Sequence, residues 1–201
     1  MQIPVTYLII GFTCLVSIPA FTNEKMINNM VFYPVRMKDG KELYRFFTHG
    51  FIHADYMHLI FNMLTLYFFG PYIESILGKP LFLLLYITAL VGASLFDYFK
   101  HRGNYYYRSL GASGAVSAVL FVTILNNPWA AEICLFGVLC LPNIIFGIAY
   151  IAYSTYMDKR GGDNVAHNAH LWGGLYGFAF AAVTRPDLFR DFLNMITHPS
   201  F

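Results

Sequence analysis

The sequence predicts an all-α polytopic membrane protein, a bundle of six transmembrane helices, and three observations lead to this prediction. Of the 201 residues, 57% are hydrophobic and 12% are charged, whereas a soluble domain is about 45–50% apolar and about 25% charged. So few charged side chains cannot cover a water-facing surface of this size. Apolar segments of roughly 20 residues, the length that crosses a bilayer, recur along nearly the whole chain.

The expected spans, in order, are residues 3–21, 56–77, 81–99, 110–126, 133–156 and 165–183. The first lacks the positive n-region of a signal peptide, and no clear cleavage site follows it, so it is assigned as a transmembrane helix. Because the six spans use almost the whole sequence, we expect one transmembrane domain, residues 1–201, and no second soluble domain.

The loops between these spans differ in length and charge. The first, Thr22–Asp55, is long, and a long ordered loop in a compact domain is usually functional. The first, third and fifth loops carry most of the basic residues: Lys25, Arg36, Lys38, Lys41, Arg45, Lys100, Arg102, Arg108, Lys159 and Arg160. The positive-inside rule alone would place these loops in the cytoplasm.

The net charge and the spacing of the cysteines indicate that the protein binds neither nucleic acid nor a metal through its cysteines. The formal net charge is only +2 and the basic residues are spread out, so no nucleic acid is expected. Cys14, Cys134 and Cys140 lie in apolar segments without a metal-binding spacing, and we interpret them as small packing residues. We expect no metal and no cofactor.

Polar groups inside a span are costly and are therefore candidates for function. His58 and Asn62 lie four residues apart on the second span, which places two hydrogen-bond donors on one helical face. Polar pairs of this kind also join helices by hydrogen bonds in membrane bundles. Taken alone, the pair favours that structural role.

Ser113 lies between glycines in Gly111-Ala112-Ser113-Gly114, at the start of the fourth span. A serine at a helix start has an open approach and neighbouring unpaired N–H groups, which together with the helix dipole favour a developing negative charge. Taken alone, the same small residues favour a helix-packing face over a catalytic role.

His170, in the sixth span, precedes Gly173 and Gly177, which form a G-x-x-x-G face. The histidine shares that face, so the helix that packs into the glycine groove would meet its side chain. The small-residue fourth span is the natural partner, and His170 could then reach Ser113. A structural histidine is an equally good interpretation of this motif on its own.

The three clusters gain weight together, because each lies near the start of the second, fourth or sixth span. Helices with even numbers begin on the same side of the membrane, so Ser113, His170, His58 and Asn62 should share one depth. A nucleophile, a base and two further donors at one level are the minimum set for acyl transfer.

These residues resemble the rhomboid family of intramembrane serine proteases. The stretch Tyr44–Asn62, YRFFTHGFIHADYMHLIFN, is similar to the family's first-loop and second-helix signature. Gly111–Gly114 matches its G-x-S-G motif, and Ala169–Gly177 matches A-H-x-x-G-x-x-x-G. The resemblance covers essentially the whole chain as a minimal six-helix, bacterial-type core with a long, partly embedded first loop.

The resemblance implies a role for each motif residue. Ser113 would be the nucleophile and His170 the base of a dyad without an acid. His58, Asn62 and the Ser113 backbone N–H would form the oxyanion hole, and Arg45 would help to fix the first loop. Substrates would be transmembrane helices of other proteins, cut in or near the surrounding lipid. The site would face the extracytoplasmic side of a bacterial inner membrane, against the charge count.

One position departs from the family pattern. Some bacterial members carry a tyrosine four residues after the nucleophile, packed against the catalytic histidine, where this sequence has Ser117. We expect the Ser117 hydroxyl, or a nearby ring such as Trp172, to orient His170 instead. His49, His53 and His167 are expected to line or border a water-filled cavity, with structural hydrogen bonding as their favoured role.

Three alternatives remain open from the sequence. His49-x-x-x-His53 and His167-x-x-His170 resemble metal-ligand spacings, but a carboxylate set at the same depth is lacking. An inactive rhomboid-like protein would bind membrane helices without cutting them, although such proteins usually lack the serine or the histidine. A transporter is disfavoured because no inverted repeat is visible.

Overall fold

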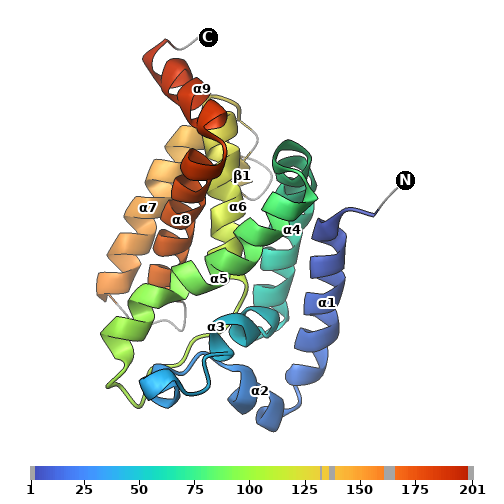
Figure 1. The fold of residues 1–201 in the computed structure, drawn as a ribbon, viewed down its shortest axis with the longest axis vertical. Helices are drawn as coiled ribbons and strands as arrows, with labels where there is room; N and C mark the ends of the chain where they lie inside the picture. The colour runs from blue at the N-terminus through green and yellow to red at the C-terminus, as the bar shows by residue number, and fades with distance from the viewer. Residues whose placement is uncertain (1–2, 132, 136–138, 161–165, 199–201) are drawn as a thin grey trace.

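The computed structural model describes residues 3–131, 133–135, 139–160 and 166–198. Within these ranges the chain is mostly helical, as predicted (Figure 1). Its elements are α1 (Val5–Ala20), α2 (Glu24–Met30), the 3₁₀ helix η1 (Pro34–Gly40), α3 (Arg45–Thr48), the 3₁₀ helix η2 (His49–Phe51), α4 (Tyr56–Leu77), α5 (Lys79–His101), α6 (Ser113–Asn126), β1 (Ile133–Leu135), β2 (Leu139–Leu141), α7 (Asn143–Arg160), α8 (His167–Thr184) and α9 (Pro186–Thr197).

Six of these helices, α1 and α4 to α8, lie at the positions of the expected spans. Among the described residues, α4 and α5 are long and apolar enough to cross a bilayer on length and composition alone, whereas α1 and α6 are apolar but shorter. That six helices cross the membrane, and that residues 1–201 form a single domain, therefore stay predictions. Positions 136–138 and 165, which two of the expected spans include, lie outside the described residues.

The fifth expected span, residues 133–156, is wrong at both ends. Its first part forms an antiparallel hairpin of β1 and β2, in which Cys134 lies opposite Cys140, and the helix begins only at Asn143 and continues to Arg160. Pro142 has no N–H to donate, and the backbone and side-chain N–H groups of Asn143 donate to the carbonyls of Ala130 and Asn127. A short apolar run does not by itself distinguish strand from helix.

The prediction that all three cysteines are small packing residues is wrong for Cys140, which lies in β2. Cys140 is disulfide-bonded rather than a simple packing residue, while Cys14 is a free, half-buried thiol in α1. The strand β1, which pairs with β2, lies nearer to the end of the molecule that carries α9 than to α2 and α3 (Figure 1).

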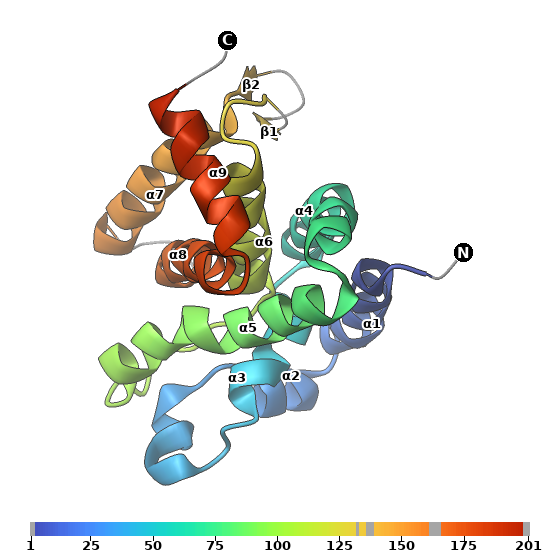
Figure 2. The same cartoon turned by 45° about the horizontal axis from the view of Figure 1, so that its top comes forward.

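The α6 helix lies at the centre of the bundle, where every residue from Gly114 to Leu125 is buried. It packs against α4, α5, α7, α8 and α9, and Figure 2 shows α8 running beside it. The first residues of α4, α6 and α8 all lie at the end of the molecule occupied by α2 and α3 (Figure 1). The three sequence motifs, which lie near these helix starts, are therefore directed toward the same end of the bundle.

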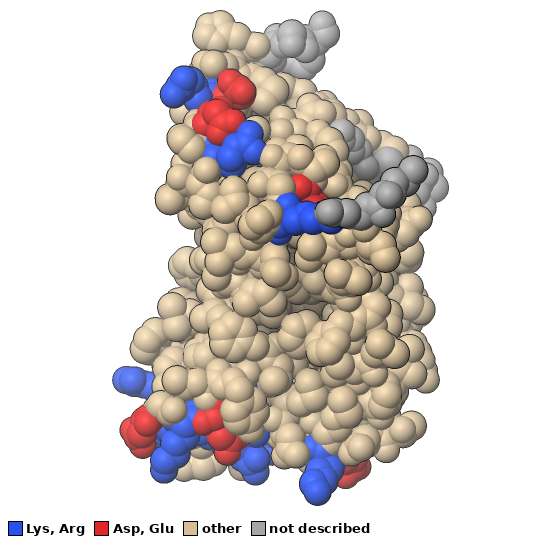
Figure 3. Space-filling model, turned by 45° about the vertical axis from the view of Figure 1, so that its right-hand side comes forward, with Lys and Arg blue, Asp and Glu red and all other residues tan. Residues whose placement is uncertain are grey.

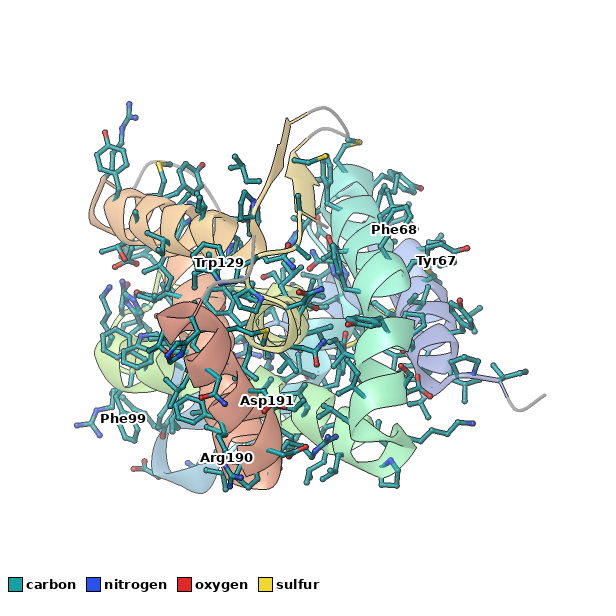
Figure 4. All side chains as sticks on the ribbon, turned by 90° about the horizontal axis from the view of Figure 1, so that it is seen from above. Tyr67, Phe68, Phe99, Trp129, Arg190 and Asp191 are labelled. Atoms are coloured by element: carbon teal, nitrogen blue, oxygen red, sulfur yellow. The ribbon has the colours of Figure 1, made fainter. Side chains whose placement is uncertain are left out.

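The outer surface between the two ends is apolar. Charged side chains gather toward the two ends of the visible face and leave a broad uncharged belt between them (Figure 3). Large apolar side chains point outward from the molecule, among them Tyr67 and Phe68 on α4 and Phe99 on α5, which are 52%, 67% and 58% exposed (Figure 4). Charged groups are rare inside a bilayer, so this belt has the chemistry of a lipid-facing surface.

Candidate active site

Ser113 is the first residue of α6, and the first loop holds the segment that leads into it. Phe32 and Ser109 exchange two backbone hydrogen bonds, and the Gly111 N–H donates to the His49 carbonyl at 2.9 Å. The first N–H groups of a helix have no partner within the helix, so Ser113 lies where backbone donors and the positive helix end point outward.

Gly111 cannot be replaced without strain, for two reasons. Its φ of +117° is a conformation that only glycine adopts readily. A Cβ at this position would also lie 2.6 Å from Cε1 of His58. The absence of a side chain therefore lets the His58 imidazole lie directly against the loop that precedes Ser113.

The α6 and α8 backbones touch through the two glycines of the predicted face. A Cβ on Gly173 would overlap the carbonyl oxygen of Gly114, and one on Gly177 would overlap that of Ala118. Gly114 in turn lies against the Ala169 carbonyl, 3.4 Å from where its own Cβ would be. The G-x-x-x-G face therefore brings the start of α8, with His170, against the start of α6.

One pocket collects the predicted site residues. It has a volume of about 470 Å³. Its walls come from the start of α4, from α6, from α7 and from α8: Ala54, Asp55, His58, Phe61, Asn62, Thr65, Ser113, Val116, Ser117, Leu120, Phe146, Tyr150 and His170. Ser113 and His170 are both partly exposed, so a molecule in the pocket can reach each of them.

His58 and Asn62 are held by local hydrogen bonds. Asp55 caps α4 by accepting from the His58 backbone N–H at 2.8 Å. The Asn62 amide donates to the His58 carbonyl at 2.9 Å, and because an amide carries two N–H bonds, a second donor is left over. Both side chains face the pocket that Ser113 lines.

His53 connects the first loop to the residue before Ser113. The Ala112 N–H donates to Nε2 of His53 at 3.3 Å, so Nδ1 carries the proton and donates to the Ser17 hydroxyl at 2.8 Å. Ser17 donates onward to the Phe51 carbonyl at 2.9 Å. Burial, reinforced by the neighbouring His58, lowers the pKa of His53 to about 3, which keeps the accepting nitrogen free of a proton.

Other residues named from the sequence have structural contacts. Nδ1 of His49 donates to the Arg45 carbonyl at 2.8 Å, and its Nε2 lies 3.2 Å from the Ser94 hydroxyl of α5. Arg45 is 1% exposed, and its guanidinium donates to the carbonyls of Asn28 and Val31 and to Glu42. Buried arginine contacts of this kind tie the first loop into one folded unit.

The ring beside His170 comes from a residue that the sequence analysis did not identify. Tyr150 of α7 stacks on the His170 imidazole, with ring centroids 6.0 Å apart and planes 20° apart. The Tyr150 and Ser117 hydroxyls lie 2.7 Å apart. Trp172 stacks on Phe96 of α5 instead. Tyr150 is one of 15 tyrosines and belongs to no motif, so only the packing of α7 identifies it.

The histidines do not assemble a metal centre in the part of the chain that the structure covers. No group of three or more His, Cys, Asp or Glu side chains in the described ranges is placed so that it could hold a metal ion. His49 and His53 instead bind different partners, as described above, and His167 lies edge-on to Tyr153 at a centroid distance of 5.7 Å.

Fold and site together define a helical membrane protein with a serine, a histidine and two further polar side chains around one pocket in its helix bundle. The model of the Rhomboid domain matches residues 40–187, and the chain therefore belongs to the rhomboid family. Proteins of this family are embedded in membranes.

Three relatives illustrate the similarity. The chain is 30% identical over 185 residues to RHOMBOID-like protein 12, mitochondrial, of Arabidopsis thaliana, covering 85% of this chain and 54% of that protein. It is 30% identical to Rhomboid protease GlpG of Salmonella paratyphi A, over 71% of this chain and 49% of that protein. It is 28% identical to Rhomboid protease GluP of Bacillus subtilis, over 70% and 26%. The chain thus spans about half or less of these relatives.

Proposed function

We propose that this chain is an intramembrane serine endopeptidase, which hydrolyses peptide bonds in or near transmembrane segments of other membrane proteins. The observation that carries the proposal is the pocket that Ser113, His170, His58 and Asn62 line together. Two of the relatives are named rhomboid proteases, which supports the same activity.

In the proposed reaction, the neutral His170 imidazole accepts the Ser113 hydroxyl proton as the serine oxygen attacks the scissile carbonyl carbon. The imidazolium then gives this proton to the leaving amine as the C–N bond breaks, and an ester remains on Ser113. Water attacks the ester with His170 again as base, and the proton returns to the serine oxygen as the acid product leaves.

The negative oxygen of each tetrahedral intermediate needs donors that are already in place. The Ser113 backbone N–H, the spare N–H of Asn62 and a ring N–H of His58 are the proposed donors. The α6 helix start adds its positive end to the same place. Losing one such donor typically costs about 10²–10³ in rate.

The substrate must present an accessible carbonyl to Ser113. A transmembrane helix hides its carbonyls in its own hydrogen bonds, so it has to unwind locally, which Gly or Pro near the cut makes easier. The proposed substrates are therefore membrane-spanning helices with a weak segment near the level of the α4, α6 and α8 starts, and no metal or nucleotide is needed.

Reaction with a fluorophosphonate tests the proposal directly. In detergent or lipid vesicles, the wild type should form a covalent adduct at Ser113 and cut a model transmembrane helix placed between two soluble reporters. Ser113→Ala should do neither, His170→Ala should lose cleavage, and a chelator should change nothing. A wild type that folds but neither labels nor cuts would be a rhomboid-like protein that only binds membrane helices.

We also propose that six helices cross a bacterial inner membrane with the pocket facing the extracytoplasmic side. Family resemblance supports this orientation, and the basic first, third and fifth loops predict the reverse. Tyr106 in the third loop is 96% exposed, so Tyr106→Cys should react with an impermeant maleimide on intact spheroplasts, whereas Asp191→Cys on α9 should not. The opposite labelling pattern would reverse the orientation.

A further inference from the structure

The His170 imidazole lies between two other rings. Tyr150 lies nearly parallel to it, with a centroid distance of 6.0 Å and an angle of 20°. His167 meets it edge-on, at 5.9 Å and 74°. Both geometries are the favourable ones for aromatic pairs, so the two contacts restrict rotation of the imidazole about its side-chain bonds.

The Tyr150 ring is itself fixed on several sides. Its hydroxyl is 2.7 Å from that of Ser117, which is 1% exposed. Its ring also packs against Phe121 of α6 at 6.0 Å and against Phe146 of its own helix at 5.9 Å. Because a hydrogen bond and two neighbouring rings hold the Tyr150 ring in place, it offers a rigid surface against which the smaller His170 imidazole can pack.

These contacts connect the two proposed catalytic helices through a third helix. Ser117 lies four residues after Ser113, on the same face of α6. The path from Ser117 to Tyr150 and on to His170 therefore runs from α6 through α7 to α8. The His170 imidazole therefore packs against a side chain of α7, and that side chain in turn contacts α6.

We propose that Tyr150 is a positioning residue for His170, and that the Tyr150 ring holds the imidazole in the orientation that the proposed dyad needs. The inference rests on the proposed function. The Tyr150 ring contributes to the orientation of the proposed base by stacking on its imidazole.

Fluorophosphonate labelling and cleavage of the model transmembrane helix test this with a set of matched variants. Tyr150→Leu removes the ring and should lower kcat and the labelling rate by about 10²-fold, the cost of misplacing a catalytic group by about 1 Å, with KM changed less than about twofold. Tyr156→Leu removes a 59% exposed tyrosine of the same helix and should leave both rates unchanged.

The hydroxyl contact is tested by a double-mutant cycle. Tyr150→Phe and Ser117→Ala each delete the same hydrogen bond, so each should slow labelling by about threefold to tenfold, and the double variant should be no slower than either alone. Combining Tyr150→Leu with Ser117→Tyr returns a ring to the pocket from α6 and should recover most of the lost rate, which a merely structural defect would not.

Thermal unfolding of each variant separates the outcomes. Wild-type labelling by a folded Tyr150→Leu variant would overturn the inference while leaving the proposed function intact. If Tyr150→Leu does not fold, the cycle decides: non-additive losses support the inference, and losses that multiply independently overturn it. A folded wild type that does not label would overturn the proposed function and this inference together.

Discussion

The two sides of α6 are built in opposite ways. Toward α8, backbone meets backbone at Gly173 and Gly177, with no room for even one carbon atom. Toward α4 and α7, the same helix lines a pocket of about 470 Å³. The tightly packed side toward α8, called the closed side, sets where Ser113 and His170 lie relative to each other. The side that lines the pocket, called the open side, has room for the proposed substrate. A site inside a helix bundle needs both properties, and one central helix supplies them.

The largest expected effect comes from forcing the closed side apart. Gly173→Leu should destabilise the protein by about 1–3 kcal/mol or prevent folding, and any folded fraction should lose more than about 10²-fold in cleavage because the helices are displaced. Thermal unfolding and fluorophosphonate labelling measure the two effects. Gly11→Leu on α1 is the matched control, since nothing lies within 4 Å of a Cβ at that position. Equal stability of the two variants would show that the glycine contact is not needed.

The next largest effect is expected from removing a hydrogen-bond donor that faces the pocket, the Asn62 amide. Asn62→Ala should lower kcat by about 10²-fold, with little change in KM, because the spare amide N–H is proposed to act on the transition state rather than on the bound substrate. Asn194→Ala on the exposed face of α9 is the control and should cleave at the wild-type rate. A loss that appears only in KM would place Asn62 in substrate binding instead.

A smaller effect should come from acid, through His53 behind the serine loop. Its pKa is lowered to about 3 in the folded protein, whereas an unfolded histidine titrates near about 6.5. Between these values the unfolded chain binds more protons, so stability should fall as the pH falls from about 6.5 toward about 3. Thermal midpoints at pH values of about 7.5 and about 5, on either side of the unfolded pKa, measure the fall.

The matched variant for this prediction is His53→Gln. An amide can accept from Ala112 and donate to Ser17 without titrating, so the variant should fold at neutral pH and lose less stability in acid than the wild type does. An identical fall in both proteins would assign the acid sensitivity to other groups.

The smallest effect on stability is expected from an exposed residue that lines the pocket, Phe61. Phe61 lines the pocket and is 57% exposed, so Phe61→Ala should change the free energy of unfolding by less than about 0.5 kcal/mol. KM for the model transmembrane helix should change, while the small fluorophosphonate should react at a similar rate. A large loss of stability would mean that the pocket wall is part of the core.

Sequence reasoning worked where the chemistry is local. The helices α4 and α6 begin within three residues of their expected starts, because apolar length and a glycine-rich start are properties of the sequence itself. It failed at residues 133–135 and 139–141, which pair as two antiparallel strands before α7 begins at Asn143. The periodicity of these residues is compatible with strand and helix alike, and the amide contacts that start α7 join segments that are distant in the chain.

The sequence alone determined the set of chemical groups and their order: a serine at a helix start, a histidine on a glycine face, and two donors one turn apart. These follow from spacing, since residues three or four apart share a helical face whatever surrounds the helix. Only the tertiary structure decided which helices enclose the pocket and that Tyr150 supplies the ring beside His170. Those contacts depend on the packing of α7 against α6 and α8, which no local pattern encodes.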